Sequence, residues 1–470
     1  MKTLELYEFV NETDLSLDDG VEQRKRIAIL GLVSEIGSIL AALKKDLLVA
    51  NNKENTREQS LVRGELIEEI GDTIWYAVML AQCILEDEQA DAARDIFKSG
   101  ISRLKQHLTG KSRNNRRTQA QLEPEKISAF VKEADIFLES ENASIDEFQI
   151  LAYKTRRTDD RQLKDICSAV LQQLAAQLSR DLLPDSELIL NHEVRPKDSV
   201  KALGEMIWHL AALASLFKFK LSDSIAAVKE KSEFRNPSGR PGPDHSTKGD
   251  AEEQFPKKFQ VHFVSLNDKT ADMYWVEHDR CIKKLGDPLT DNNYADDGYR
   301  FHDVMHIAFA AYLGWSPNLR SFMGLKRKSV AEIDNVEDGG RAKILEEAII
   351  LEIHETAKAK RKHLQFAGCA DTVSPFGYDN ALNFGFLRRL RAMTFGHEVY
   401  ENPKQDWEAA IKNGYQCYEQ LREHMGGIIS VDTDEKSISF TALDETNRID
   451  YSTPSIPPKR RLCEVCRTAL

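Results

Sequence analysis

The stretch LVRGELIEEIGDTIWYAVMLA, residues 61–81, decides the fold of the first half of the chain. Its apolar residues recur at a spacing near 3.6, which predicts an amphipathic helix. Glu65, Glu69 and Asp72 fall together on the polar face of this helix, where a solvated acidic surface is the ordinary explanation. The opposite, apolar stripe consists of Ile67, Ile70, Ile74, Ala77, Val78 and Ala81.

A second stretch, GLVSEIGSILAALKKDLL at residues 31–48, changes that interpretation. Apolar side chains surround most of this predicted helix and leave Glu35 beside Leu32 and Ile39. A carboxylate on a helix that is expected to be buried needs a partner. Mg²⁺ is a sufficient partner, because it binds carboxylate oxygens together with waters and substrate phosphates. Two facing acidic helices therefore predict a site for magnesium and a nucleotide.

These residues resemble the site of the all-α nucleoside triphosphate pyrophosphohydrolases of the MazG type. That family carries a Glu-x-x-Glu pair on one helix and a Glu-x-x-Asp pair on the next. Glu69 and Asp72 match the second pair and Glu35 matches the first Glu, whereas Ser38 stands where the second Glu would be. The loop between the pairs, with NNKENTREQS, is also long for the family. Compensation by another glutamate, fewer bound ions and reduced activity all remain open.

The resemblance implies hydrolysis of the bond between the α- and β-phosphates of a ribo- or deoxyribonucleoside triphosphate, which releases a monophosphate and pyrophosphate. It implies Mg²⁺ as the cofactor, with Mn²⁺ as a substitute. The metal would be held by Glu35, Glu69 and Asp72, and Glu65 or Glu68 would serve as an auxiliary ligand or general base. Such ions make a nucleophile of a bound water and stabilise charge on the leaving pyrophosphate.

Four basic residues are candidates for binding the nucleotide. Lys44 and Lys45 follow Glu35 by about two helical turns and would neutralise outer phosphate charge; the alternative is that they serve the helix dipole and solubility. Lys231 and Arg235, in VKEKSEFRNPSG, resemble the family's basic segment after the last helix, which implies that they reach the nucleotide at the first site. The alternative there is an ordinary basic helix end before a Pro-Gly linker.

The first 236 residues look internally duplicated. IGDTIWYAVMLA from Ile70 aligns with LGEMIWHLAALA from Leu203, and LKKDLL from Leu43 aligns with LSRDLL from Leu178. The two offsets, 203 − 70 = 133 and 178 − 43 = 135, nearly agree, as a duplicated helical unit with a small loop change requires.

The second copy has lost most of the acidic chemistry, so we expect it to be catalytically silent. MazG-type domains usually associate, which implies that the tandem pair forms within one chain the bundle that relatives build from two subunits. We also expect a homo-oligomer. The second-copy residues that correspond to Glu35, Ser38, Glu69 and Asp72 are Val170, Gln173, Ala202 and Glu205.

Composition and charge narrow the class of protein. The formal net charge of −12 argues against a broad surface for duplex DNA, so nucleic acid is an improbable partner, although local basic patches stay compatible with it. The uninterrupted apolar runs are short of the ~18 residues that span a membrane, and no leader precedes the first helix, so we expect a cytoplasmic protein without membrane contact. The seven cysteines show no disulfide framework, and the single CxxC pair, Cys463 and Cys466, is weak evidence for zinc.

The fold class is expected to be mainly α: a helical bundle of tandem MazG-like repeats, then a mostly helical α+β domain with a small sheet. FQVHFVS from Phe259 alternates like a strand, and GGIISVDTDEKSISFTAL reads as two strands joined at Asp434-Glu435. Pro, Gly and charged residues mark a linker before them. The expected division is 1–120 MazG-like domain, 121–236 degenerate repeat, 237–258 linker, 259–450 C-terminal domain and 451–470 tail.

The C-terminal half contains a second candidate site. RFHDVMHIAFAAYLGW places His302 and His306 one helical turn apart with Asp303 beside them, and Glu346 and Glu347 follow on another predicted helix. Two such histidines can bind a transition metal, and the His-Asp pair superficially resembles HD-type phosphohydrolases. That family also needs an upstream His and a downstream Asp, and the sequence does not identify them. The alternative is that these histidines stabilise a helix or a buried hydrogen-bond network.

The stretch 299–347 resembles the domain found C-terminal to MazG-type domains in bacterial systems proposed to act in conflict with phages. This implies that the hydrolase depletes nucleotides or destroys a nucleotide signal under control of the C-terminal part, with a partner protein of such a system. The basic run 326–328 is a candidate for holding phosphate or nucleic acid, with a solvated loop as the alternative. Three functions are therefore open: a Mg²⁺-dependent pyrophosphohydrolase, a nucleotide sensor or scaffold without turnover, and a C-terminal metal-dependent phosphohydrolase.

Overall fold

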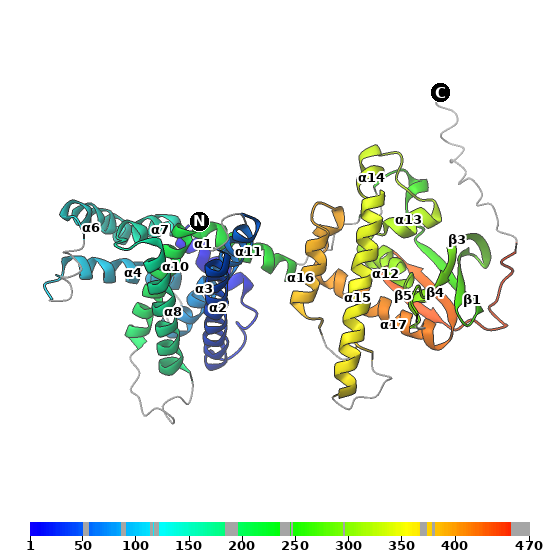
Figure 1. Ribbon diagram of the computed structural model, residues 1–470, viewed down its shortest axis with the longest axis horizontal. Helices are drawn as coiled ribbons and strands as arrows, with labels where there is room; N and C mark the ends of the chain where they lie inside the picture. Colours follow the sequence, from blue (N-terminus) through cyan, green and yellow to red (C-terminus); the bar gives the residue numbers. More distant parts are fainter. Residues whose placement is uncertain are drawn as a thin grey trace. The chain divides into compact units, whose positions relative to one another are not determined.

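The computed structural model describes most of the chain, in two compact units, 1–232 and 233–470 (Figure 1). The described part is mainly helical with one small antiparallel sheet, as the sequence predicts. Cys463, Cys466 and residues 237–244 and 246–247 of the predicted linker lie outside the described residues. The described residues are 1–49, 56–85, 91–112, 116, 122–183, 196–235, 245, 248–294, 297–366, 374–377 and 381–452.

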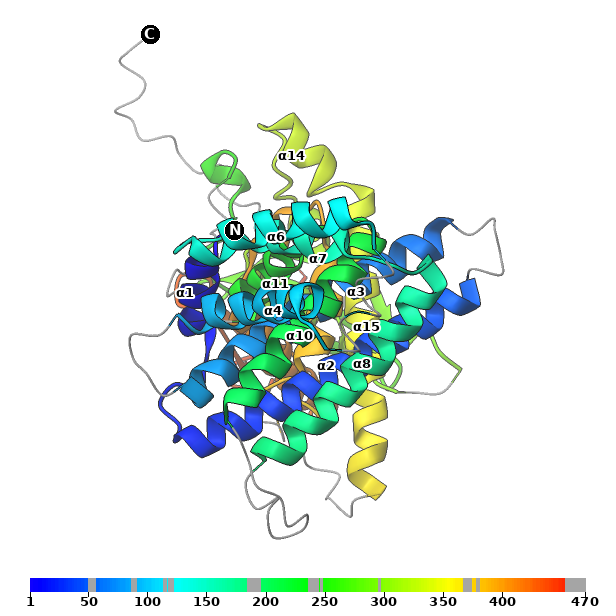
Figure 2. The same cartoon turned by 90° about the vertical axis from the view of Figure 1, so that its left-hand side faces the viewer.

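The first unit is a bundle of helices around one hydrophobic core that runs from Leu6 to Val228 (Figure 2). Within it α2 packs on α3 and α8 packs on α10, while α2 also contacts α8 and α3 contacts α10. The two segments predicted as repeats therefore share a single core. The helices are α1 (Thr3–Thr13), α2 (Val21–Val49), α3 (Thr56–Leu85), α4 (Ala92–Thr109), α6 (Pro124–Glu139), α7 (Ile145–Lys154), α8 (Asp160–Leu182), α10 (Pro196–Leu216) and α11 (Leu221–Arg235).

Two glycines at aligned positions permit close helix contacts in this unit. A Cβ atom on Gly71 of α3 would lie 2.4 Å from the backbone oxygen of Ser224 in α11. A Cβ atom on Gly204 of α10 would lie 2.6 Å from the backbone nitrogen of Gly100 in α4. Helix α4, which follows α3 in the chain, thus packs on α10, and helix α11, which follows α10, approaches α3. This exchange brings α11 to the acidic face of α3.

Helix α2 is less buried than its composition predicts. Leu30 and Val33 are 62% and 39% exposed, so the expectation that protein surrounds most of this helix is wrong for one of its faces. Residues 21–48 are also long and apolar enough to cross a membrane by length and composition, which a count of uninterrupted apolar runs missed. Core helices pass the same test, and α10 with α11 passes it only as a pair bent by 100°. Such helices are weak evidence for a span.

The second unit is built on a sheet with strand order β3-β2-β1-β4-β5. Because β1 pairs with β4, the sheet joins the two ends of the unit, as the strand patterns predict. The β2–β3 hairpin was not predicted, because its turn carries His278 and Asp279 at positive φ in place of the Asn-Gly that signals such turns. The strands are β1 (Lys258–Asn267), β2 (Thr270–Glu277), β3 (Arg280–Thr290), β4 (Gly426–Asp432) and β5 (Ser437–Thr441).

The helices of the second unit pack on this sheet. Every residue of α12 is buried, since that helix lies between α17 and the strands β4 and β5. An almost wholly apolar helix can be accommodated only in such a position. The helical elements are η2 (Ala251–Glu253), η3 (Tyr299–Phe301), α12 (Val304–Leu313), α13 (Pro317–Met323), α14 (Ala331–Val336), α15 (Gly340–Phe366), α16 (Phe384–Met393), η4 (Glu398–Glu401) and α17 (Lys404–Glu423).

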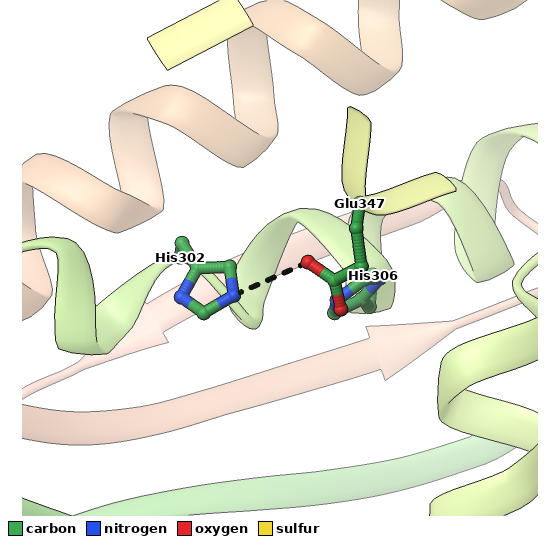
Figure 3. Close-up of side chains that lie close together, drawn as sticks. All are labelled: His302, His306 and Glu347. Atoms are coloured by element: carbon green, nitrogen blue, oxygen red, sulfur yellow. Dashed lines mark hydrogen bonds and ion pairs between the residues drawn. The ribbon is translucent and has the colours of Figure 1, made fainter. Parts of the chain in front are cut away.

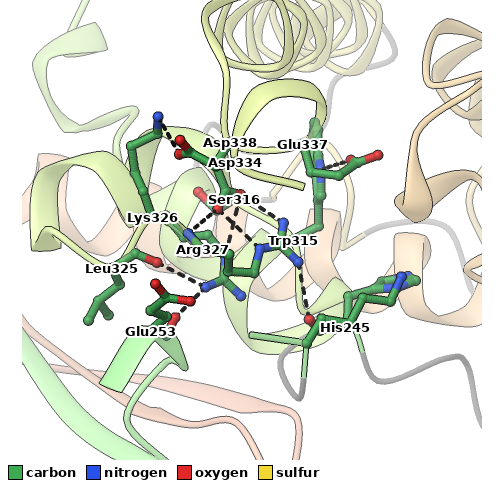
Figure 4. Close-up of polar contacts among 12 residues, drawn as sticks. His245, Glu253, Trp315, Ser316, Leu325, Lys326, Arg327, Asp334, Glu337 and Asp338 are labelled. Atoms are coloured by element: carbon green, nitrogen blue, oxygen red, sulfur yellow. Dashed lines mark hydrogen bonds and ion pairs between the residues drawn. The ribbon is translucent and has the colours of Figure 1, made fainter. Parts of the chain in front are cut away.

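A buried ion-pair network follows α13 and includes part of the predicted basic run (Figure 4). Arg327 is fully buried, and its guanidinium nitrogens lie 2.7 Å from a carboxylate oxygen of Asp338 and 2.7 Å from one of Glu398. Lys326 pairs with Asp334 at 2.7 Å. A buried arginine needs such full pairing. Arg327 is therefore neither a solvated loop residue nor a phosphate ligand, and both expectations for it were wrong.

Candidate functional site

Three carboxylates from α2 and α3 meet in the first unit. Glu35, Glu69 and Asp72 each offer one oxygen, and these oxygens lie within 4.8 Å of one another. Residues three apart on a helix share a face, so Glu69 and Asp72 both point toward α2. Asp72 is only 8% exposed, and Glu35 and Glu69 are half-buried. The structure thus brings together the three residues predicted as metal ligands.

The cluster has strong electrostatic strain. Burial, together with the neighbouring carboxylates of Glu35, Glu68 and Asp72, raises the pKa of Glu69 to about 8. Burial also raises the pKa of Asp72, although the ammonium of Lys231 opposes that shift. Burial and like charge both disfavour the ionised carboxylate, and a bound cation would favour it. The donor set, all carboxylate oxygen, fits a hard divalent cation such as Mg²⁺.

Lys231 of α11 lies at the edge of this cluster. Its Nζ is 2.6 Å from Oδ2 of Asp72 and 3.2 Å from Oε1 of Glu68. Burial lowers the pKa of Lys231, but the two carboxylates outweigh burial and the net pKa is raised. The sequence predicted that Lys231 reaches the first site, and the structure places it against the carboxylates themselves. Its contact with a nucleotide stays a prediction.

The other predicted basic residues have different surroundings. Lys45 donates to both oxygens of Glu65, at 2.7 and 2.8 Å, in an ion pair between α2 and α3 with both side chains substantially exposed. Lys44 is exposed. Arg235 belongs to the second unit, where its guanidinium carbon lies 4.4 Å from the centroid of the Phe384 ring. Glu65 is thus engaged by a lysine outside the cluster.

The second segment uses its aligned acidic residue differently. Glu205, which corresponds to Asp72, forms an ion pair with Arg103 of α4 at 2.7 Å. Within the described ranges, the first unit has one group of carboxylates, histidines or cysteines that could hold a metal ion, and Glu205 is outside it. An arginine therefore compensates Glu205.

A second cluster lies in the other unit, at the start of α12 and on α15 (Figure 3). His302, His306 and Glu347 offer ligand atoms within 4.8 Å of one another. The carboxylate of Glu347 lies 3.2 Å from Nε2 of His306 and 3.6 Å from Nε2 of His302. Asp303 Oδ1 lies 3.1 Å and 3.7 Å from the Nε2 atoms of His302 and His306. Four of the residues predicted for this site therefore converge.

Glu346, the fifth predicted residue, lies behind the imidazole of His306. Its Oε1 is 2.8 Å from Nδ1 of His306, and its carboxylate accepts hydrogen bonds from Ser316 Oγ and the backbone nitrogen of Asn318. Burial lowers the pKa of His306, but the surrounding carboxylates outweigh burial and raise it well above the usual value. Sequence reasoning treated Glu346 and Glu347 as one acidic pair and missed that they approach opposite nitrogens of the same ring.

The described chain is thus a mainly helical protein with a carboxylate cluster on facing helices in one unit and a histidine-carboxylate cluster in the other. Residues 241–444 match the family model of the MazG C-terminal domain. This match covers less than half of the chain, and it supports membership of a MazG-related family. Comparisons with curated proteins and with solved structures found no match.

Proposed function

We propose that this protein is a metal-dependent hydrolase of nucleoside triphosphates that cleaves between the α- and β-phosphates and releases pyrophosphate. The observation that carries the proposal is the meeting of Glu35, Glu69 and Asp72, where burial and the neighbouring carboxylates raise the pKa of Glu69 to about 8. The match to the MazG C-terminal domain supports a nucleotide-related activity.

In this proposal Glu35, Glu69 and Asp72 hold the metal. Bound Mg²⁺ supplies a more acidic water and neutralises charge on the leaving pyrophosphate. Glu68 accepts the proton of the attacking water, since it lies at the edge of the cluster and Lys231 holds its carboxylate there. In this proposal the ammonium of Lys231 reaches an anionic phosphate of the substrate at the same edge. When substrate binds, Lys231 exchanges a carboxylate partner for this phosphate.

A nucleotide sensor without turnover is the second candidate. Two observations favour it: Ser38 supplies no carboxylate, and Lys231 already neutralises part of the charge of Asp72. Both reduce the attraction for a divalent cation. In either case the biological output that we propose is the depletion or detection of nucleotides in a defence system, under control of the second unit.

The test is pyrophosphate release from a panel of ribo- and deoxyribonucleoside triphosphates with Mg²⁺ and, separately, Mn²⁺. The variants are Glu69→Ala with Asp72→Ala, and Glu205→Ala as the matched control from the second segment. Release that the double variant loses and the control keeps would support the hydrolase. Binding without release in the wild type would favour the sensor, and release that survives in a folded double variant would overturn the assigned site.

A further inference from the structure

We propose that the second unit contains a binding site for one divalent transition-metal ion, formed by His302, His306 and Glu347 with Asp303 as a further donor. This site is separate from the nucleotide site and does not depend on the proposed hydrolysis, which needs residues of the first unit alone.

The spacing of the donor atoms suits a single ion. Metal–ligand bonds of about 2.1 Å place neighbouring donors roughly 3.0 to 3.4 Å apart in octahedral or tetrahedral geometry. The Nε2 of His302 lies 3.1 Å from Asp303 Oδ1 and 3.6 Å from Glu347 Oε2. The Nε2 of His306 lies 3.2 Å from Glu347 Oε1 and 3.7 Å from Asp303 Oδ1. Small movements of these side chains would therefore complete a coordination shell.

The other nitrogen of each imidazole lies close to an oxygen atom. Nδ1 of His302 lies 2.7 Å from the backbone oxygen of Tyr299, and Nδ1 of His306 lies 2.8 Å from Oε1 of Glu346. Metal-binding histidines usually have such a carbonyl or carboxylate behind the ring, which fixes the tautomer and leaves Nε2 for the metal.

Glu346 is itself fixed in place. It is fully buried and accepts hydrogen bonds from Ser316 Oγ at 2.6 Å and from the backbone nitrogen of Asn318 at 2.9 Å. A buried carboxylate with these bonds cannot swing toward the front of the ring without losing them. The arrangement keeps His306 oriented toward Glu347, as a built metal site requires.

The donor set and its access indicate the class of ion. Two imidazoles with carboxylates favour Zn²⁺, Fe²⁺ or Co²⁺, whereas Mg²⁺ favours the all-oxygen cluster of the first unit. The Glu347 side chain is 43% exposed, while His306 is only 1% exposed. The cluster therefore opens to solvent on the Glu347 side, where an ion can keep a position for water or an anionic oxygen.

The experiment uses the full chain carrying Glu69→Ala and Asp72→Ala, so that the first cluster cannot supply the ligands. After chelation, the protein is titrated with Co²⁺ alone, and the visible d–d absorption and bound cobalt are measured in the presence of excess Mg²⁺. We expect about one Co²⁺ per chain, with a spectrum of nitrogen and oxygen ligation. Zn²⁺ should displace the Co²⁺.

The discriminating variants are His302→Gln and Glu347→Gln, which change the less buried ligands and avoid emptying the core at His306. Glu352→Gln is the matched control, because Glu352 lies on the same helix and its side chain is also 43% exposed. Loss of the spectrum in the first two, with retention in the control, would support the site. Failure of the parent to bind Co²⁺, or equal binding by folded Glu347→Gln, would reduce the cluster to a structural hydrogen-bond network.

Discussion

Lys231 Nζ lies 2.6 Å from Asp72 Oδ2, although the two residues are 159 positions apart in the chain. The contact joins α11 to α3, so a helix of the second segment contributes charge to the carboxylate cluster of the first. An ammonium and a metal ion compete for the same oxygen. We therefore expect Lys231 to raise the Mg²⁺ concentration at which the cluster binds metal.

Replacing Lys231 with Met tests two roles of this lysine: competition with the metal ion and binding of the nucleotide. We expect the Mg²⁺ concentration for half-maximal pyrophosphate release to fall, because the competing cation is gone. We also expect kcat/KM for the nucleotide to fall by about 10- to 100-fold at saturating Mg²⁺, the range for loss of one charge-assisted hydrogen bond. Lys229→Met is the control, since Lys229 is exposed on the same helix. Identical Mg²⁺ and nucleotide dependences in both variants would exclude a role for Lys231 at the site.

The close approach of α11 to α3 gives a second prediction. An alanine at Gly71 would place Cβ 2.4 Å from the backbone oxygen of Ser224, so the helices must separate. We expect Gly71→Ala to destabilise the first unit by about 1–3 kcal/mol, as overpacking of a core does. Gly64→Ala on the same helix meets nothing within 4 Å and should be neutral or stabilise by up to ~1 kcal/mol. Urea unfolding of both variants measures the contrast, and a Gly71→Ala variant as stable as Gly64→Ala would contradict the packing.

A third prediction concerns the missing carboxylate. Ser38 is half-buried on α2, one turn after Glu35, where the resemblance expects a second Glu. We expect Ser38→Glu to lower the Mg²⁺ concentration needed for activity by about tenfold, the effect of roughly 1.4 kcal/mol of added metal affinity. Ser34→Glu, an exposed position on the same helix, is the control for added charge. If both variants respond alike, Ser38 does not face the metal.

How far the sequence could predict these sites depends on how far apart in the sequence the contacting residues lie. Glu69 and Asp72 share a helix face by spacing alone, and the resemblance to the MazG-type site added Glu35 of the preceding helix. The position of Lys231 follows from the packing of α11 on Gly71, which is a contact distant in sequence. The family's basic segment was the one signal for it, and that signal did not distinguish a phosphate contact from an ion pair.

Buried charged residues were the second feature that the sequence could not predict. Arg327 lies in a short basic run, a pattern that normally marks a solvated surface, and its two carboxylate partners come from separate later segments. Glu346 and Glu347 are adjacent in sequence, but successive residues of a helix differ by about 100° in direction, so one is enclosed and the other reaches solvent. Spacing within a motif cannot show which residue of such an adjacent pair is buried against another helix and which reaches solvent.

The fourth prediction is a pH dependence in the second unit that arises from a buried histidine. Burial lowers the pKa of His262 to about 4, and its ring nitrogens lie 2.9 Å from the hydroxyl of Tyr451 and 3.2 Å from Oε1 of Gln260. The unfolded chain binds this proton near pH 6.5 and the folded chain only near pH 4. The unfolded state therefore holds more protons between these values, and stability falls as pH falls through that window.

His262 should contribute about 3 kcal/mol to this loss between pH 6.5 and pH 4. We expect His262→Gln, which keeps an amide for hydrogen bonding but cannot titrate, to be less stable at neutral pH and to have a flatter dependence of unfolding free energy on pH. The measurement is denaturant unfolding of the full chain at a series of pH values, with His278→Gln in the exposed β2–β3 turn as the control. A His262→Gln slope as steep as that of the control would show that the acid sensitivity has another source.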